Sequence, residues 1–148
     1  MKSKIVNMLM VLPIGLLLMI SCSKEQGCTD IDATNFSETA QEDDGSCGYK
    51  GRNIIWYGKT TAEKLVADGA TTLTYYVEGS VVGSSAASVY WTGSPNCGID
   101  GSVTISKDLG NVKSKSFSYS VKDQTGYEYF VGTLNFSANT CEAIELIW

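Results

Sequence analysis

The chain has 148 residues, and its 16 acidic and 11 basic side chains give a formal charge of −5. An acidic chain lacks the cationic surface that offsets phosphate repulsion, so we expect no nucleic-acid partner. The chain contains no histidine. This removes the commonest general base and the commonest metal ligand, so we expect neither an enzyme nor a resident cofactor.

Residues 1–21 are predicted to be a signal peptide. Lys2 and Lys4 precede an apolar, uncharged run over residues 8–20. A basic start followed by a short apolar stretch is typical of a secretory signal. The run is too short for a membrane-spanning helix, which needs about 20 apolar residues.

The end of this segment, Leu18-Met19-Ile20-Ser21-Cys22, resembles the lipobox of bacterial lipoproteins, with Met19 where leucine is most usual. The resemblance implies that signal peptidase II cleaves before Cys22 after a diacylglycerol is attached to its sulfur. Several acyl chains anchor a protein stably in a membrane. The alternative is an ordinary secretory signal with an unrelated cysteine near its end.

Residues 22–26 are expected to form a lipidated tether. Ser23 directly after the cysteine resembles lipoproteins sorted to the outer membrane. The pair Lys24-Glu25 is similar to the charged export signal of some surface lipoproteins in Bacteroidetes-type bacteria, and its alternative interpretation is a solvated spacer. Either the periplasmic face of the outer membrane or the cell surface therefore fits the sequence.

The five cysteines are Cys22, Cys28, Cys47, Cys97 and Cys141. Lipidation of Cys22 leaves four, and an oxidising compartment favours disulfides between them. Of the three possible connectivities, we expect the local pairs Cys28–Cys47 and Cys97–Cys141. A zinc site is the disfavoured alternative, because the sequence has no Cys-x-x-Cys spacing and no histidine.

Residues 27–48 are predicted to form an acidic loop held by the first disulfide. Seven of the 16 acidic residues lie between Glu25 and Asp44, and the segment has too few apolar residues for a core of its own. It resembles a short cysteine-bounded repeat of surface proteins in Bacteroidetes-type bacteria, with departures at Ile31 and Glu38. The matching residues are Cys28, Thr29, Asp30, Ala33, Asn35, Phe36, Ala40, Asp43, Asp44, Gly45, Ser46 and Cys47.

This loop also offers hard oxygen donors for calcium, the one metal ion that the sequence leaves open. The candidate ligands are Asp30, Asp32, Asn35, Asp43 and Asp44. Their spacing differs from that of an EF-hand. The alternative is a solvated acidic spacer that ends in an Asp-Asp-Gly-Ser turn.

Residues 52–148 are predicted to form an antiparallel β-sandwich of about seven or eight strands with one short helix. In residues 72–78, Leu73, Tyr75 and Val77 share one face, as in a half-buried strand. Thr60 and Glu63 match a capping box, and Gly69 would end the helix. Strands are expected at residues 53–57, 72–78, 81–82, 87–91, 102–106, 116–122, 128–136 (with a possible bulge at Gly132) and 142–148, where Ile144, Leu146 and Trp148 share a face.

The same region resembles a recurrent domain of small Bacteroidetes-type lipoproteins. The matching elements are residues 55–57, 75–80, 95–98, 101–104, 126–136 and 138–141. That family has no assigned activity, so the resemblance implies a fold and a location in the cell envelope without a mechanism.

The sequence therefore predicts a lipid-anchored envelope lipoprotein with a structural or ligand-binding, non-catalytic β-sandwich. A sharper alternative is a carbohydrate- or protein-binding accessory lipoprotein. Tyr76, Tyr127 and Tyr129 are its candidate ligand residues, because they lie on strand faces opposite the predicted core. A secreted hydrolase using Glu63, Asp68 or Asp123 is the remaining alternative.

Overall fold

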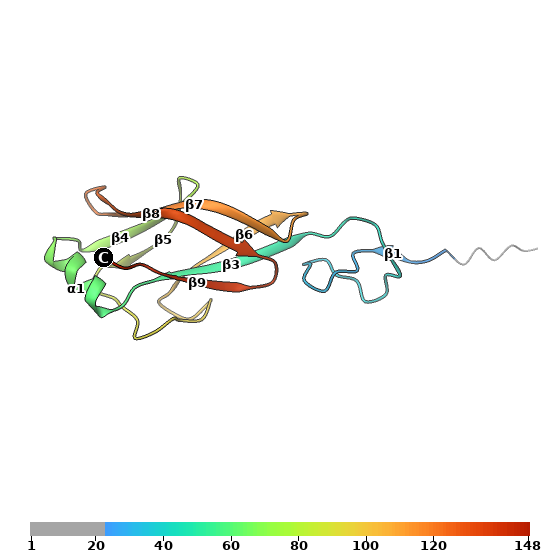
Figure 1. The fold of residues 1–148 in the computed structure, drawn as a ribbon, viewed down its shortest axis with the longest axis horizontal. Helices are drawn as coiled ribbons and strands as arrows, with labels where there is room; N and C mark the ends of the chain where they lie inside the picture. Colours follow the sequence, from blue (N-terminus) through green and yellow to red (C-terminus); the bar gives the residue numbers. More distant parts are fainter. Residues whose placement is uncertain (1–22) are drawn as a thin grey trace, which may run out of the picture.

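The computed structural model describes residues 23–148, so the predicted signal peptide and Cys22 lie outside the described residues. Residues 23–148 form an all-β, sandwich-like fold with one helix (Figure 1). Its elements are β1 (Gln26–Gly27), β2 (Glu42–Asp43), β3 (Tyr49–Trp56), α1 (Lys59–Ala67), β4 (Thr72–Val77), β5 (Ser80–Ala86), β6 (Val103–Gly110), β7 (Ser114–Asp123), β8 (Glu128–Ser137) and β9 (Cys141–Glu145).

Seven strands form the two sheets of the sandwich. One sheet has the order β6-β3-β9, and the other has the order β5-β4-β7-β8. All neighbouring strands are antiparallel except β3 and β9, which run parallel. The chain changes sheet after β3, β5, β6 and β8, so the core is closed by segments far apart in sequence.

The predicted alternation in β4 is confirmed. Leu73, Tyr75 and Val77 are buried, and they meet Phe136 and Leu134 of β8 in one hydrophobic core. Asn53 of β3 is also fully buried, and its side-chain amide donates a 2.6 Å hydrogen bond to the carbonyl of Asn135 in β8. This bond ties the two sheets together across the core.

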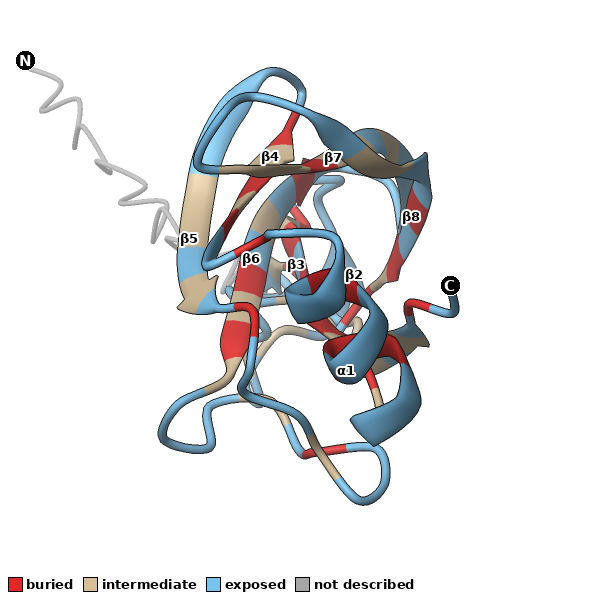
Figure 2. Cartoon of the chain, turned by 90° about the vertical axis from the view of Figure 1, so that its left-hand side faces the viewer, coloured by how far each residue is buried: buried red, intermediate tan, exposed pale blue. Residues whose placement is uncertain are grey.

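Helix α1 packs over the end of the sandwich at which β3 ends and β4 begins, and Figure 2 shows it at the near end of the strands. It buries Thr61, Ala62 and Leu65. The predicted capping box is wrong, because the helix begins earlier, with Gly58 as its N-cap and no side-chain cap. The predicted stop is confirmed: Gly69 follows the helix with φ at 96°, a conformation that glycine adopts without strain.

Two further strand predictions are wrong. Residues 87–91 form no strand; they follow β5 as a turn and loop, where the Trp91 amide donates a single backbone hydrogen bond to Tyr57. Gly132 is not a bulge, since β7 and β8 pair regularly there and the register shift lies at Val121/Lys122. A Cβ on Gly132 would lie 2.7 Å from the ring of Tyr119, so close packing explains this glycine.

Gly51 of β3 is a position where a side chain should be costly. An added Cβ would lie 2.8 Å from the carbonyl oxygen of Ser137 and 3.0 Å from the Cβ of Phe136. We expect Gly51→Ala to lower the free energy of unfolding by about 1–3 kcal/mol, because backbone must move to relieve the contact. Urea titration measures this loss. Gly93→Ala, with no atom within 4 Å of the new Cβ, is the control and should change stability little.

Candidate functional site

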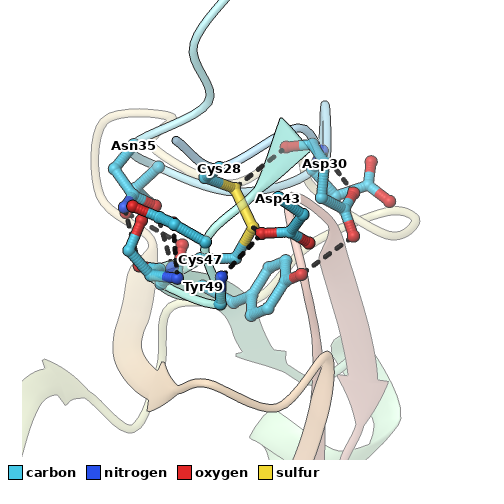
Figure 3. Close-up of a disulfide and its surroundings, with 12 residues drawn as sticks. Cys28, Asp30, Asn35, Asp43, Cys47 and Tyr49 are labelled. Atoms are coloured by element: carbon cyan, nitrogen blue, oxygen red, sulfur yellow. Dashed lines mark hydrogen bonds between the residues drawn. A yellow bond between two sulfur atoms is a disulfide. The ribbon is translucent and has the colours of Figure 1, made fainter. Parts of the chain in front are cut away.

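The acidic loop is a separate small structure stapled by the buried Cys28–Cys47 disulfide, which confirms the predicted pairing. Strands β1 and β2 pair parallel within it. Asn35 closes the loop, since its Oδ1 accepts a hydrogen bond from the Gly48 amide and its amide donates to the Ser46 carbonyl (Figure 3). The loop leads directly into β3, which begins at Tyr49 and not at the predicted residue 53.

The five candidate calcium ligands do not converge on one point. Figure 3 shows Asn35 and Asp30 on opposite sides of the disulfide. The side chains of Asp43 and Asp44 accept hydrogen bonds from the amides of Gly45 and Ser46 and so shape their own turn. Within residues 23–148, no three His, Cys, Asp or Glu side chains are grouped as metal ligands.

From the hydrogen bonds and ion pairs of the candidate ligands, we propose that the loop keeps its fold without calcium. Because each candidate ligand already accepts a hydrogen bond or pairs with a lysine, millimolar calcium should leave the thermal midpoint unchanged. Differential scanning calorimetry with calcium and then with a chelator measures this. A midpoint that rises with calcium and falls with the chelator would contradict the proposal.

Lys113, in the β6–β7 turn, joins the acidic loop to the sandwich by ion pairs with Asp30 and Asp32, which we call the Lys113 latch. Its ammonium nitrogen lies 2.7 Å from Asp30 Oδ2 and 3.2 Å from Asp32 Oδ2. Tyr49 donates a 2.8 Å hydrogen bond to the same oxygen of Asp30. Lys113 first, and then Tyr49, hold the pKa of Asp30 below its ordinary value of 3.8. The same contacts raise the pKa of Lys113 above its ordinary value of 10.5.

This latch should be intact over a wide but bounded pH range. Since the pKa of folded Asp30 is lowered, its contribution is complete above pH 3.8 and is lost as the pH falls further. Since the pKa of Lys113 is raised, its contribution is complete below pH 10.5 and is lost as the pH rises further.

We expect Lys113→Gln to speed amide hydrogen exchange in residues 27–48 at pH 7, with a modest, salt-dependent effect because the pair is partly exposed. Lys59→Gln, which removes the exposed Lys59–Glu63 pair of α1, is the control and should leave that exchange unchanged. Equal exchange in the two variants would show that Lys113 does not hold the loop.

Two of the three predicted ligand tyrosines lie together, at the end of the sandwich opposite the acidic loop. Tyr127 and Tyr129 make an edge-to-face contact with ring centroids 4.9 Å apart. Trp148 packs edge-on against Tyr129 at 5.1 Å. We call Tyr127, Tyr129 and Trp148 the aromatic cluster. Tyr76 is not part of it: it lies on the outer face of β4, half-buried beneath the ammonium group of Lys122.

Hydrogen bonds from α1 and the turns hold the cluster in place. Asp68, directly after α1, accepts a 2.8 Å hydrogen bond from the Tyr129 hydroxyl. Partial burial, and then this contact with a carboxylate, raise the pKa of Tyr129 to about 12. Lys64 donates to the carbonyl oxygen of Trp148 at 2.6 Å. The sequence predicted a strand over residues 142–148 with Trp148 on the same face as Ile144 and Leu146, but β9 ends at Glu145 and the Trp148 side chain is exposed.

The carboxylates considered for hydrolysis have separate structural partners. Glu63 pairs with Lys59 along α1, and Asp68 binds Tyr129. Asp123 accepts hydrogen bonds from Thr125 and from the Tyr127 amide, so it shapes the β7–β8 turn. The structure therefore gives each of these side chains a role in the fold.

The second disulfide, Cys97–Cys141, ties the loop before β6 to the start of β9, as predicted. Two disulfides indicate a protein that folds outside the reducing cytoplasm. In the described part of the chain, no helix is long and apolar enough to cross a membrane. No family model, curated protein or solved structure matches this chain.

Proposed function

We propose that this chain is an exported, lipid-anchored protein of the cell envelope, whose β-sandwich binds a ligand and carries out no catalysis. The lipobox-like sequence ending at Cys22 and the two disulfides support export. The absence of histidine from the sequence supports a non-catalytic role.

The observation that carries this proposal is the placement of the two ends of the molecule. The acidic loop with β1 lies at one end, and α1 and the C-terminal end of the chain lie at the other (Figure 1). A lipid on Cys22 would hold the acidic loop next to the membrane. The aromatic cluster would then point away from the membrane, where a ligand can reach it.

The stapled loop and the Lys113 latch fit the role of a spacer. The loop has its own disulfide and is fixed to the sandwich by contacts of Lys113 with Asp30 and Asp32. A semi-rigid spacer holds a binding surface off a membrane at lower entropic cost than a flexible linker.

Fractionation of cells that produce the full chain tests the anchor. We expect the wild-type protein in the outer-membrane fraction, labelled by a fatty-acid analogue. Cys22→Ser should lose the label and remain an unprocessed precursor. Ser21→Ala, which keeps a small residue before the cysteine, is the matched control and should be labelled normally. Normal processing and membrane retention of Cys22→Ser would refute the lipid anchor.

Protease treatment of intact cells separates the two locations that the proposal allows. Digestion without lysis indicates display on the cell surface, and digestion only after lysis indicates the periplasmic face. The proposal of a lipid-anchored binding protein holds in both cases and fails if the protein is recovered from the cytoplasm.

A further inference from the structure

The aromatic cluster exposes more ring surface than packing requires. Tyr127 is 62% exposed and Trp148 is 41% exposed, and both contact the half-buried Tyr129. Scattered exposed aromatic residues are normal on protein surfaces, but here Tyr129 contacts both Tyr127 and Trp148, so the three rings lie next to one another as one apolar patch. Such a patch stays exposed at a cost in free energy, which a ligand can recover by covering it.

The cluster is held rigidly before any ligand arrives. Gln124 fastens the β7–β8 turn to the segment after α1, accepting hydrogen bonds from the amides of Thr71 and Thr72 and donating to the Gly69 carbonyl. Asp123 accepts a 2.9 Å hydrogen bond from the Tyr127 amide. Side chains and loops that are ordered in advance lose little entropy on binding. This surface can therefore hold a ligand whose small apolar area contributes only a modest binding free energy.

The polar groups around the rings are mixed in charge. Asp68 and Lys64 each contact one ring residue, and Lys122 pairs with Glu128 at 3.5 Å beside the β7–β8 turn. Side chains of both signs thus occur at the cluster and the adjoining turn, which favours neither a polyanion nor a polycation. They offer both donors and acceptors at the edge of the apolar surface.

A neutral sugar matches this arrangement. One face of a hexopyranose presents C–H groups that pack on an aromatic ring, while its hydroxyls around the edge need hydrogen-bond partners. A protein partner fits less well, because a standard protein interface covers about 800 Å² on each partner and its core is depleted of charged residues. Here Asp68 accepts a hydrogen bond from the Tyr129 hydroxyl, and Lys64 donates to the main-chain oxygen of Trp148.

We propose that Tyr127, Tyr129 and Trp148, together with Asp68, form a binding site for a neutral oligosaccharide. This inference rests on the proposed function, of which it names the ligand class. Tyr127 and Trp148 supply the stacking surfaces. Tyr129 is the central ring that positions both, and the Asp68 carboxylate orients Tyr129 through its hydroxyl.

Titration of the full chain tests the site. The protein is purified in a detergent without a sugar headgroup and titrated calorimetrically with maltohexaose, cellohexaose, mannohexaose and chitohexaose. We expect at least one of these to bind. Tyr127→Ala and Trp148→Ala should each weaken that binding roughly tenfold or more, the loss of about 1.4 kcal/mol expected when one stacked ring is removed.

The controls separate the site from general effects on folding. Tyr90→Ala removes a tyrosine of similar exposure (43%) outside the cluster and should bind normally. Asp68→Asn keeps the size of the side chain, so it should lower the ionisation pH of Tyr129 in an absorbance titration and weaken binding less than Tyr127→Ala does. Circular dichroism of every variant should match that of the wild type.

Two outcomes would overturn the proposal. These are no binding of any of the four oligosaccharides, and binding that survives both Tyr127→Ala and Trp148→Ala. Capture of a protein partner through these rings without sugar binding would count as the first outcome. Because the protein is in detergent, the result is independent of lipid attachment, so failure of the anchor and failure of the sugar site are distinguishable.

Discussion

Removing the Cys97–Cys141 disulfide is expected to lower the free energy of unfolding by about 4 kcal/mol. The bond closes a loop with a sequence separation of 44, and that loop contains β6, β7 and β8. In the unfolded chain this closure removes much conformational entropy. In the folded chain it fixes β9, whose parallel pairing with β3 joins strands far apart in the sequence.

Urea unfolding of a Cys97→Ala/Cys141→Ala double variant measures the loss. The matched variant Cys28→Ala/Cys47→Ala opens the smaller loop, which has little apolar core of its own. We expect it to speed amide exchange in residues 27–48 while leaving most of the exchange protection of the sandwich in place. A loss below about 1 kcal/mol in the first variant would show that β9 is held by its other contacts.

Phe136→Ala is expected to have the second large effect, a loss of about 3–5 kcal/mol. Phe136 of β8 is fully buried and makes an edge-to-face contact with Phe117 at 5.4 Å. It also lies against Gly51 of the opposite sheet. Truncation would leave a cavity between the two sheets. The closely packed backbones of β3 and β8 could not easily shift to fill it.

The control for this prediction is Phe36→Ala in the acidic loop. Phe36 is 38% exposed, so its truncation should cost less than about 1 kcal/mol. Thermal or urea unfolding compares the two variants directly. Similar losses in both would mean that the core does not lie between β3 and β8 as described.

Strands could be predicted from the sequence where apolar and polar residues alternate along the chain. Leu73, Tyr75 and Val77 alternate with polar residues, and all three are buried as expected. Both disulfides were also predicted, because lipidation of Cys22 would leave an even number of cysteines and local pairing is the simplest choice.

The errors arise where a neighbour far away in the sequence decides the structure. Residues 87–91 have strand-like composition, but no strand pairs with them, so they form a loop. The parallel pairing of β3 with β9 was not predicted, since no local signal indicates it. Helix α1 begins at Lys59, before Thr60, with Gly58 as its N-cap, so the local capping pattern does not set the helix boundary.

The sequence predicted two of the four residues of the candidate sugar site. Tyr127 and Tyr129 stood out because they lie opposite the predicted core face, and the structure brings them into contact. Trp148 was predicted to share a strand face with Ile144 and Leu146, and Asp68 was considered only as a carboxylate of a hydrolase. Only the folded chain shows that both meet Tyr129, across separations that sequence patterns cannot report.

Intact mass spectrometry of the protein purified from membranes tests the lipid anchor. We expect a chain that begins at Cys22 and carries the added mass of a diacylglycerol, with both disulfides formed and residues 1–21 removed. A chain that retains residues 1–21, or one that begins at another residue without any lipid, would contradict it.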